Sequence, residues 1–481
     1  MKVKKKYLAL MLFNLIALCM IRAFSLEFTF GLAIVLWVDL LLFCWFDLEN
    51  RGIFLGFLLC FFVFLMGRQT LEYFRLHEVE IYFPKSIEVQ ANRLLLLSLI
   101  GLFVGYVFLG SIRLKKKTYE IESVKSEGKA RTYRQISKYF YYLTFPLALL
   151  TLLESARFVQ SQGYYASYVD YQSRLPSVVL RLSSMNGVFF FVYLACLPGK
   201  RESRFPIILR VVYLGLTLFT GHRYNCIGGL LILVVYFMLR NKQEIDSKWF
   251  DRKKMFVVAV GAVAIMILSN VVSVTRLGGK AAVNVSSSIT DFFYQQGVSI
   301  SVVKRYLEYN AYLPKGKLYF LGSTLSGISR SLPGRLIFGM KAYGGNSIDT
   351  ARNGYYLAHA LSYVVLGDQY LSGGGTGSSY IAEIHYSFGY LGVLLGNVFY
   401  GVLLRKLFVL REGRVWRNAV VLLMLNALFF ASRGEFDGWI GDLLNTNTWG
   451  AMLMVFVTAQ LVRAVNRARR HREEASREPA L

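Results

Sequence analysis

The sequence has few of the side chains that bind metal ions or form disulfides. It holds five histidines and five cysteines among its 481 residues. No HExxH motif and no CxxC pair is present, and the histidines have no ligand-like spacing. The cysteines fall in or beside apolar runs, as small hydrophobic residues do: Cys19, Cys44, Cys60, Cys196 and Cys226. We expect neither a metal site nor a disulfide framework.

Motifs of nucleotide-driven and serine-dependent enzymes are also missing. The chain has no GxxxxGK[ST] loop, which excludes a P-loop pump. It has no GxSxG elbow, which argues against a serine hydrolase of that type.

Acidic residues are outnumbered by basic ones, 29 to 55, and the formal net charge is +26. Such a charge is compatible with nucleic-acid binding. Here, however, the basic residues are divided among short loops between apolar runs, where they set membrane topology and contact lipid headgroups. We therefore expect membrane lipids as partners and no nucleic acid.

Long apolar runs are what the sequence has in abundance. Hydrophobic residues make up 55% of the chain, and runs of bilayer-spanning length recur along it, as in an all-α polytopic integral membrane protein. The N-terminal run resembles a signal peptide but lacks a small-residue cleavage site, so we expect a retained helix. We place about twelve transmembrane helices at 7–24, 28–46, 52–68, 92–112, 136–157, 178–198, 206–221, 224–240, 255–274, 379–404, 417–432 and 447–464.

Basic loops predict the orientation of these spans. "KVKKK" places the N-terminus in the cytoplasm, and alternation then puts each strongly basic loop and the basic C-terminal tail on the same side. The predicted organisation is an N-terminal bundle of about nine helices over 1–274, one large external loop over 275–378, about three C-terminal helices over 379–464, and a cytoplasmic tail over 465–481. The stretch "ITDFFYQQGVSISVVKRYLEYN" in the large loop is helix-like.

Arginines on the opposite, outer side go against the positive-inside rule. Arg223 lies at the tip of a tight hairpin beside His222 and Asn225, while Arg276 and Arg433 lie at span ends. The large loop adds further outer arginines, including Arg330 and Arg335. A guanidinium binds phosphate oxygens in a bidentate manner, so arginines at one membrane level suit a lipid pyrophosphate. The alternative is that these arginines, and Arg68, pair with acidic neighbours or lipid headgroups.

Carboxylates near the outer side form the second group of candidates. Glu383, Tyr386 and Tyr390 share one face of the predicted helix at 379–404. An ionisable group entering a membrane helix is costly, so Glu383 is a candidate general base or the ion partner of an arginine. Asp437 and its neighbour Glu435 lie in "FFASRGEFDGW", where they are either helix caps and solvated acids or part of the site.

Two local motifs accompany this architecture. One is the Gly-x-Arg-x-Asn hairpin in "TGHRYNCIGGLL", and the other is the Glu…Tyr…Phe-Gly-Tyr-Leu-Gly helix from Glu383 to Gly392. With about twelve spans and a single large external loop before the last helices, the chain resembles the Wzy-type O-antigen and exopolysaccharide repeat-unit polymerases. O-antigen ligases share this architecture. The Arg-x10-Gly repeats that some members carry in outer loops do not follow the loop arginines of this sequence.

The resemblance implies a GT-C-like fold and a glycosyltransferase of the bacterial inner membrane that acts at its outer face. A glycan on undecaprenyl pyrophosphate would be the donor, and a lipid-linked repeat unit the acceptor. Arg223 and Arg433 would stabilise the departing pyrophosphate without a metal or other cofactor, and Glu383 would deprotonate the acceptor hydroxyl. The remaining candidates would bind substrate: Arg276, Arg330, Arg335, His222, Asn225, Tyr386, Tyr390 and Asp437. A chain-length regulator and a flippase are the implied protein partners.

Two other functions remain open from the sequence. One is an O-antigen ligase or another lipid-linked glycosyltransferase, which the sequence barely separates from a polymerase. The other is a lipid-linked oligosaccharide transporter. Repeated halves and charges in a central cavity are typical of transporters, whereas the charges here gather at the outer side and the large loop lies in one half only.

Overall fold

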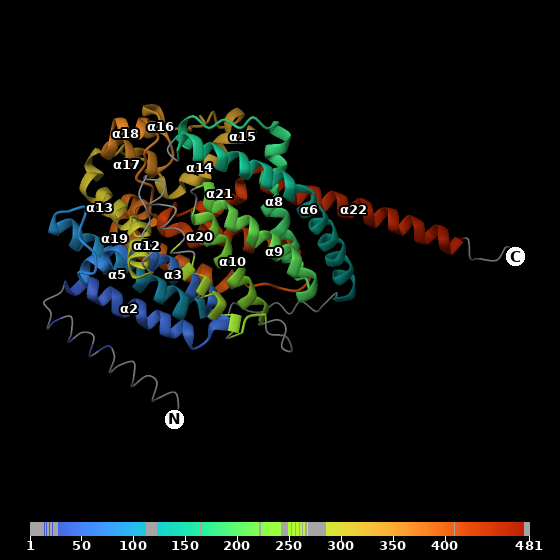
Figure 1. The fold of residues 1–481 in the computed structure, drawn as a ribbon, viewed down its shortest axis with the longest axis horizontal. Coiled ribbons are helices and arrows are strands. Elements are labelled where there is room, and N and C mark those ends of the chain that lie inside the picture. Colours follow the sequence, from blue (N-terminus) through green and yellow to red (C-terminus); the bar gives the residue numbers. More distant parts are fainter. Residues whose placement is uncertain are drawn as a thin grey trace, which may run out of the picture. The chain divides into compact units, whose positions relative to one another are not determined.

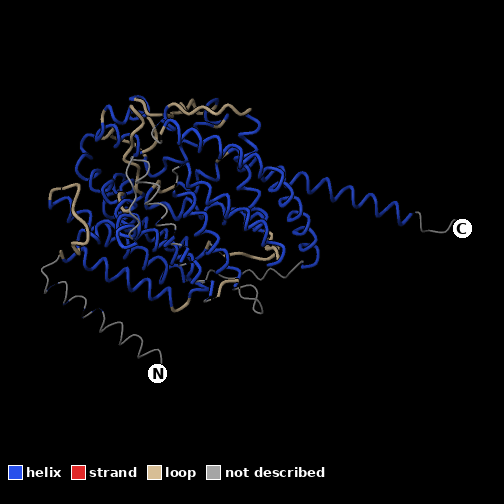
Figure 2. Tube along the Cα trace, in the orientation of Figure 1, coloured by secondary structure: helices blue, strands red, loops and turns tan. Residues whose placement is uncertain are grey.

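The computed structural model describes residues 27–111, 123–163, 166–220, 223–241, 285–407 and 409–475, with scattered residues in 14–22 and 249–267. Within these residues every regular element is a helix (Figure 2). An all-helical chain suits a bilayer, because a helix satisfies its own backbone hydrogen bonds where no water is present. The all-α prediction is therefore confirmed for the described part of the chain.

Nine of the described helices are long and apolar enough to cross a membrane. They coincide with nine predicted spans: Phe28–Trp45, Asn50–Tyr73, Lys85–Phe108, Gly128–Gln162, Ser177–Ala195, Lys200–Thr220, Tyr380–Lys406, Val415–Arg433 and Thr446–Arg469. The predicted span at 224–240 corresponds to the shorter apolar helix Asn225–Asn241. Those at 7–24 and 255–274 fall largely outside the described residues. The protein is thus a multi-pass membrane protein by these helices, and the count of twelve and the GT-C-like fold stay predictions.

The chain forms two compact units. Unit 1 consists of Met1–Leu114, Leu231–Phe408 and Asn426–Gly438, and unit 2 of Lys115–Leu230, Val409–Leu425 and Trp439–Leu481. Unit 1 contains the elements that concern the site: α2 (Phe28–Trp45), α3 (Leu48–Phe61), the π-helix η1 (Phe62–Met66), α4 (Gly67–Tyr73), α5 (Lys85–Phe103), η2 (Val104–Phe108), α12 to α19, and the 3-10 turn η7 (Ala431–Arg433).

Helix α19 (Tyr380–Lys406) lies against α5 and η2 in unit 1 (Figure 1). Glycine allows this close approach. A Cβ added at Gly105 would lie 2.1 Å from the backbone oxygen of Val398, and one added at Gly401 would lie 2.6 Å from that of Leu102. Small residues at such contacts let membrane helices pack backbone to backbone without a hydrophobic driving force. This packing fixes the helix that carries Glu383.

The stretch predicted as a large external loop is a series of short helices where it is described. They are α12 (Val285–Gln296), α13 (Ser299–Tyr309), α14 (Gly322–Arg330), α15 (Leu332–Leu336), α16 (Ile348–Asn353), α17 (Leu357–Leu366) and α18 (Asp368–Leu371). The helix-like stretch at 289–310 is thereby confirmed as most of α12 and α13. In unit 1, α13 contacts both α5 and α19, so this segment packs directly on the helices.

Unit 2 is built around α6 (Ser123–Gln162), α8 (Ser177–Ala195) and α22 (Thr446–Ala475), which contact one another. The amide of Asn186 donates to the backbone oxygen of Tyr141 at 3.0 Å and to the hydroxyl of Thr144 at 3.0 Å. Arg463 on α22 donates to the hydroxyl of Tyr133 at 3.0 Å. These buried polar contacts satisfy groups that a bilayer would leave unpaired.

Candidate active site

The carboxylate of Glu383 is the most enclosed charged group of the candidate site. Glu383 lies near the start of α19 and is 0% exposed. Oε1 accepts a hydrogen bond from the hydroxyl of Ser378 at 2.7 Å, and Oε2 accepts one from the backbone N–H of Phe436 at 2.9 Å. A buried carboxylate is tolerated when hydrogen bonds satisfy it. Glu383 therefore joins α19 to the segment that follows η7.

Asp437 fixes the same segment on its other side. It is 1% exposed, and its two oxygens accept the backbone N–H groups of Ser323 at 3.0 Å and Thr324 at 2.7 Å. These donors lie in the first turn of α14, where N–H groups lack helical partners and favour a negative charge. Burial raises the pKa of Asp437, while the hydrogen bonds from Thr324 and Ser323 act in the opposite direction.

The tip between η7 and Gly438 is therefore held from three sides. Besides the contacts of Glu383 and Asp437, the hydroxyl of Tyr400 on α19 donates to the backbone oxygen of Phe436. The ring of Phe436 lies edge-on to that of Tyr400, with centroids 5.1 Å apart. We call residues 434–437 the acidic tip. Side chains of α19 and the N-terminus of α14 hold its backbone through these contacts.

Glu435 is the third carboxylate of this region, and it is half-buried. Its charge acts on Glu383 and on the phenol of Tyr356. Burial raises the pKa of Tyr356, hydrogen bonds with Ser326 and Ser323 lower it, and the charge of Arg330 lowers it as well. The phenol of Tyr356 is thus within electrostatic range of both Glu435 and Arg330.

The sequence predicted one uninterrupted helix at 379–404, and this prediction was wrong at Gly389. The backbone there has φ 60° and ψ −153°, so residues 380–388 and 390–406 form two helical pieces. A glycine adopts such a conformation without the steric cost of a Cβ. Broken helices in membranes occur where they line a cavity or are covered by protein. Glu383 lies on the first piece, close to the break.

The break separates Tyr386 from Tyr390, which were predicted to share a face. The hydroxyl of Tyr386 donates to the backbone oxygen of Pro314 at 2.6 Å, and its ring packs against Tyr319 with centroids 4.9 Å apart. Tyr390 begins the second piece, is exposed, and lies edge-on to His385 at 4.9 Å. Tyr386 thus contacts the long segment, while the side chain of Tyr390 is exposed.

Three of the predicted arginines are described with their side chains, and all three are exposed. Arg433 lies at the end of η7, two residues before Glu435. It donates to the amide oxygen of Gln296 at 2.9 Å and lies over the ring of Phe64 at 5.8 Å. Arg330 is the last residue of α14, and Arg335 lies in α15. Arg433 therefore adjoins the acidic tip, while Arg330 lies at the end of α14 away from the contacts of Asp437.

Other predicted residues cannot be placed in this site. Arg276 and His222 lie outside the described residues. Arg223 is the first residue of α10 (Arg223–Asn241), and its side chain lies outside the described part. Asn225, in the first turn of α10, is half-buried within unit 2. Their substrate roles stay predictions.

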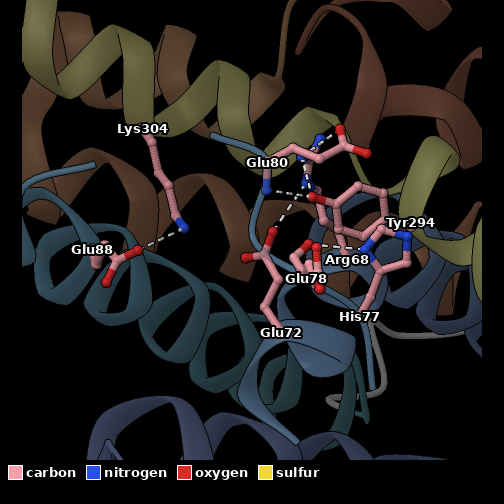
Figure 3. A network of polar contacts seen from close by, with 8 residues as sticks. All are labelled: Arg68, Glu72, His77, Glu78, Glu80, Glu88, Tyr294 and Lys304. Carbon is pink, nitrogen blue, oxygen red and sulfur yellow. Dashed lines mark hydrogen bonds and ion pairs between the residues drawn. The ribbon is translucent and has the colours of Figure 1, made fainter. Parts of the chain in front are cut away.

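Arg68 has a structural role, as the alternative explanation for outer arginines predicts. Its guanidinium lies 3.2 Å from Glu72 and 3.5 Å from Glu80, and it donates to the hydroxyl of Tyr294 at 2.6 Å. Close by, the buried Lys304 pairs with Glu88 at 3.4 Å (Figure 3). These contacts tie α12 and α13 to the segment around α4 and α5. They fix Gln296, the residue to which Arg433 donates.

Several residues of the site were missed from the sequence. Ser378 and Tyr356 had no individual signal, although Tyr356 belongs to a tyrosine-rich stretch. The hydroxyl of Tyr306 lies 2.9 Å from Nδ1 of His385, a contact between α13 and α19 that spacing alone does not predict. Among the described residues, no three histidine, cysteine or acidic side chains are grouped closely enough to hold a metal ion.

Comparison with known proteins adds one finding. The family model described as O-antigen polysaccharide polymerase Wzy matches residues 6–464, nearly the whole chain. No curated protein and no solved structure matches the chain.

Proposed function

Because the chain belongs to the O-antigen polysaccharide polymerase Wzy family, we propose that it joins lipid-linked oligosaccharide repeat units into a surface polysaccharide. The observation that carries the proposal is the acidic tip, which holds Glu435 and Asp437, is hydrogen-bonded to the carboxylate of Glu383, and adjoins the exposed Arg433. A glycosyl transfer from a lipid pyrophosphate needs both kinds of group. The carboxylate accepts a proton from the attacking hydroxyl, and the cations stabilise the charge of the leaving phosphate.

The donor in this proposal is a glycan on undecaprenyl pyrophosphate, whose tail stays in the bilayer. Arg433 is the last residue of the span Val415–Arg433, so in the proposal its guanidinium meets the membrane-anchored phosphate at the end of that helix. In the proposal, Arg330 at the end of α14 and Arg335 on α15 supply further cations. Guanidinium groups keep their charge at any physiological pH and bind phosphate oxygens in pairs. In the proposal, Arg223 and Arg276 contribute in the same manner.

The reaction is a substitution at the anomeric carbon of the donor sugar. An acceptor hydroxyl oxygen forms the new bond to that carbon, and its proton passes to a carboxylate. The bond between the anomeric carbon and the pyrophosphate oxygen breaks, and the lipid pyrophosphate leaves with the electron pair. Pyrophosphate is a good leaving group, so the proposed catalytic contribution rests on the base and on the arginines.

Glu435 fits the role of the base better than Glu383. Both oxygens of Glu383 are occupied by donors from Ser378 and Phe436, and the side chain is fully buried. A general base must reach the proton that it accepts. Glu435 lies on the same tip and is only half-buried, so part of its side chain is open to an acceptor hydroxyl. Glu383 then orients the tip.

In the same proposal the reaction takes place at the outer face of the bacterial inner membrane, with both termini in the cytoplasm. The distribution of basic loops supports this orientation. Asp437 holds α14 against the tip, and Tyr390 contacts sugar through its exposed ring. A flippase supplies the lipid-linked units, and a chain-length regulator limits the product.

Reconstitution tests this function. The purified protein in liposomes receives undecaprenyl pyrophosphate that carries one repeat unit, and a gel resolves the products. Wild type is expected to give a ladder with chelator present. Arg433→Gln lowers the rate by about 10²-fold, whereas Arg352→Gln, an exposed arginine on α16, leaves it unchanged as the matched control.

The other outcomes point to other functions. Transfer of a whole chain to a lipid A core acceptor, without a ladder, would make the protein a ligase. Movement of the lipid-linked unit across the bilayer without any new glycosidic bond would make it a transporter. A ladder that persists in Arg433→Gln would keep the polymerase and remove Arg433 from the site.

A further inference from the structure

A short turn after α14 exposes four large apolar side chains. Leu332 is 65% exposed, Leu336 80%, Ile337 74% and Phe338 69%. Scattered exposed apolar residues are ordinary, but a contiguous group of this size marks a surface that something covers. We call residues 332–338 the apolar turn.

The apolar turn has a defined backbone, so it is not an unstructured connector. The hydroxyl of Ser331 accepts the N–H of Gly334 at 3.1 Å as an N-cap, and the N–H of Met340 closes the turn on the oxygen of Gly334 at 3.0 Å. Gly334 itself passes so close to α14 that a Cβ there would lie 1.8 Å from the oxygen of Ile328. The fold therefore holds these apolar side chains outward at a fixed place.

Charge around the apolar turn is of one sign. The stretch "RSLPGRLIFGMK", residues 330–341, contains Arg330, Arg335 and Lys341 and no acidic residue. Lys341 pairs with Asp349 at 2.7 Å, while Arg330 and Arg335 have exposed side chains on either side of Leu332. Apolar side chains flanked by arginines are the composition of segments that enter the boundary between lipid headgroups and acyl chains.

The position of α14 places the turn within reach of the bilayer surface. The N-terminus of α14 is bound to Asp437, four residues beyond the end of the span Val415–Arg433. Its nine residues make a helix of about 13 Å. The apolar turn, which begins with α15 (Figure 1), starts at the other end of α14 and therefore lies within one short helix of a membrane-spanning helix end.

We infer that the apolar turn inserts into the anionic headgroup boundary of the bilayer. Leu336, Ile337 and Phe338 enter the acyl-chain boundary, and Arg330 and Arg335 contact lipid phosphates. The turn is a membrane contact of the segment between the spans, distinct from the transmembrane helices. Asp437 binds the N-terminus of α14. Insertion of the turn would fix the C-terminal end of the same helix to the lipid surface.

An environment-sensitive nitrobenzoxadiazole label at Phe338→Cys tests this inference. Four of the five native cysteines are buried and only Cys19 is exposed. A Cys19→Ser background therefore restricts labelling to the introduced cysteine. The protein is placed in nanodiscs of phosphatidylglycerol, one copy per disc. Nitroxide on the lipid chains and iodide in the water serve as competing quenchers, and a label at Gln369→Cys, an exposed polar position on α18, is the control.

The inference predicts quenching by the lipid nitroxide and protection from iodide by about threefold relative to position 369. Arg335→Gln is expected to shift the label towards water in phosphatidylglycerol discs and not in phosphatidylcholine discs. Quenching by iodide as strong as at position 369 would overturn the inference, because the turn would then face water. Protection from both quenchers would overturn it as well, since protein would then cover the turn. If Phe338→Cys misfolds, a label at Leu336→Cys makes the same measurement.

Discussion

Replacing Glu383 separates its structural role from a chemical one. In Glu383→Ala the N–H of Phe436 loses its acceptor in a buried place, which costs about 1–3 kcal/mol, and Ser378 loses a charged partner. We expect a total destabilisation of roughly 2–4 kcal/mol. In Glu383→Gln the amide oxygen accepts the N–H of Phe436, and the amide N–H donates to the hydroxyl of Ser378. This variant therefore retains most of the stability.

Thermal unfolding with a thiol-reactive dye measures the difference. Cys44, Cys60, Cys196 and Cys226 are buried and Cys19 is exposed, so in a Cys19→Ser background the dye reacts only as the fold opens. The Tm of Glu383→Ala is expected to fall by about 5–10 °C, and that of Glu383→Gln by less than half as much. Asp368→Asn, an exposed acid on α18, serves as the control. An alanine variant as stable as wild type would refute the argument that Glu383 holds the acidic tip.

Three further predictions follow from the same contacts. Burial raises the pKa of Asp437 above its unfolded value of 3.8. Its contribution to stability is therefore full below pH 3.8 and is lost as the pH rises through the folded pKa. The free energy of unfolding, measured against pH, should fall over this range, and Asp437→Asn should make the dependence on pH weaker. Gly105→Leu should prevent recovery of monodisperse protein in gel filtration because of the backbone of Val398, whereas Gly128→Ala, with open space around it, should not. Tyr306→Phe removes the hydroxyl partner of Nδ1 of His385. It should lower the free energy of unfolding by about 1 kcal/mol, seen as a lower Tm in the same dye assay. An unchanged Tm would contradict a stabilising role.

The membrane helices were predictable because one physical constraint dominates them. A helix that crosses lipid must be apolar over a bilayer's thickness, so hydropathy alone located the nine spans now described. The break in α19 was not predictable. Gly389 stands in "YSFGYLG" with no proline beside it, and a lone glycine is compatible with an unbroken helix.

The site was predictable only in part. Glu383 was identified because a carboxylate in a membrane helix is costly, but its partner is a backbone N–H 53 positions away. Asp437 was assigned either to a helix cap or to the site, and its contacts with Ser323 and Thr324 favour the cap. Contacts between distant segments depend on packing, which spacing along the chain does not encode. Glu435 lies between Phe436 and Asp437 on one side and η7 on the other, so its place beside Glu383 follows from the same packing.

The most direct test of the account compares the polymerisation rates of Glu435→Gln and Glu383→Gln in liposomes that contain the undecaprenyl-pyrophosphate-linked repeat unit. If Glu435 is the base and Glu383 orients the tip, Glu435→Gln loses about 10²–10⁴-fold in rate and Glu383→Gln stays within about tenfold of wild type. The reverse order, with Glu383→Gln stable but inactive and Glu435→Gln active, would contradict the account and make Glu383 the base.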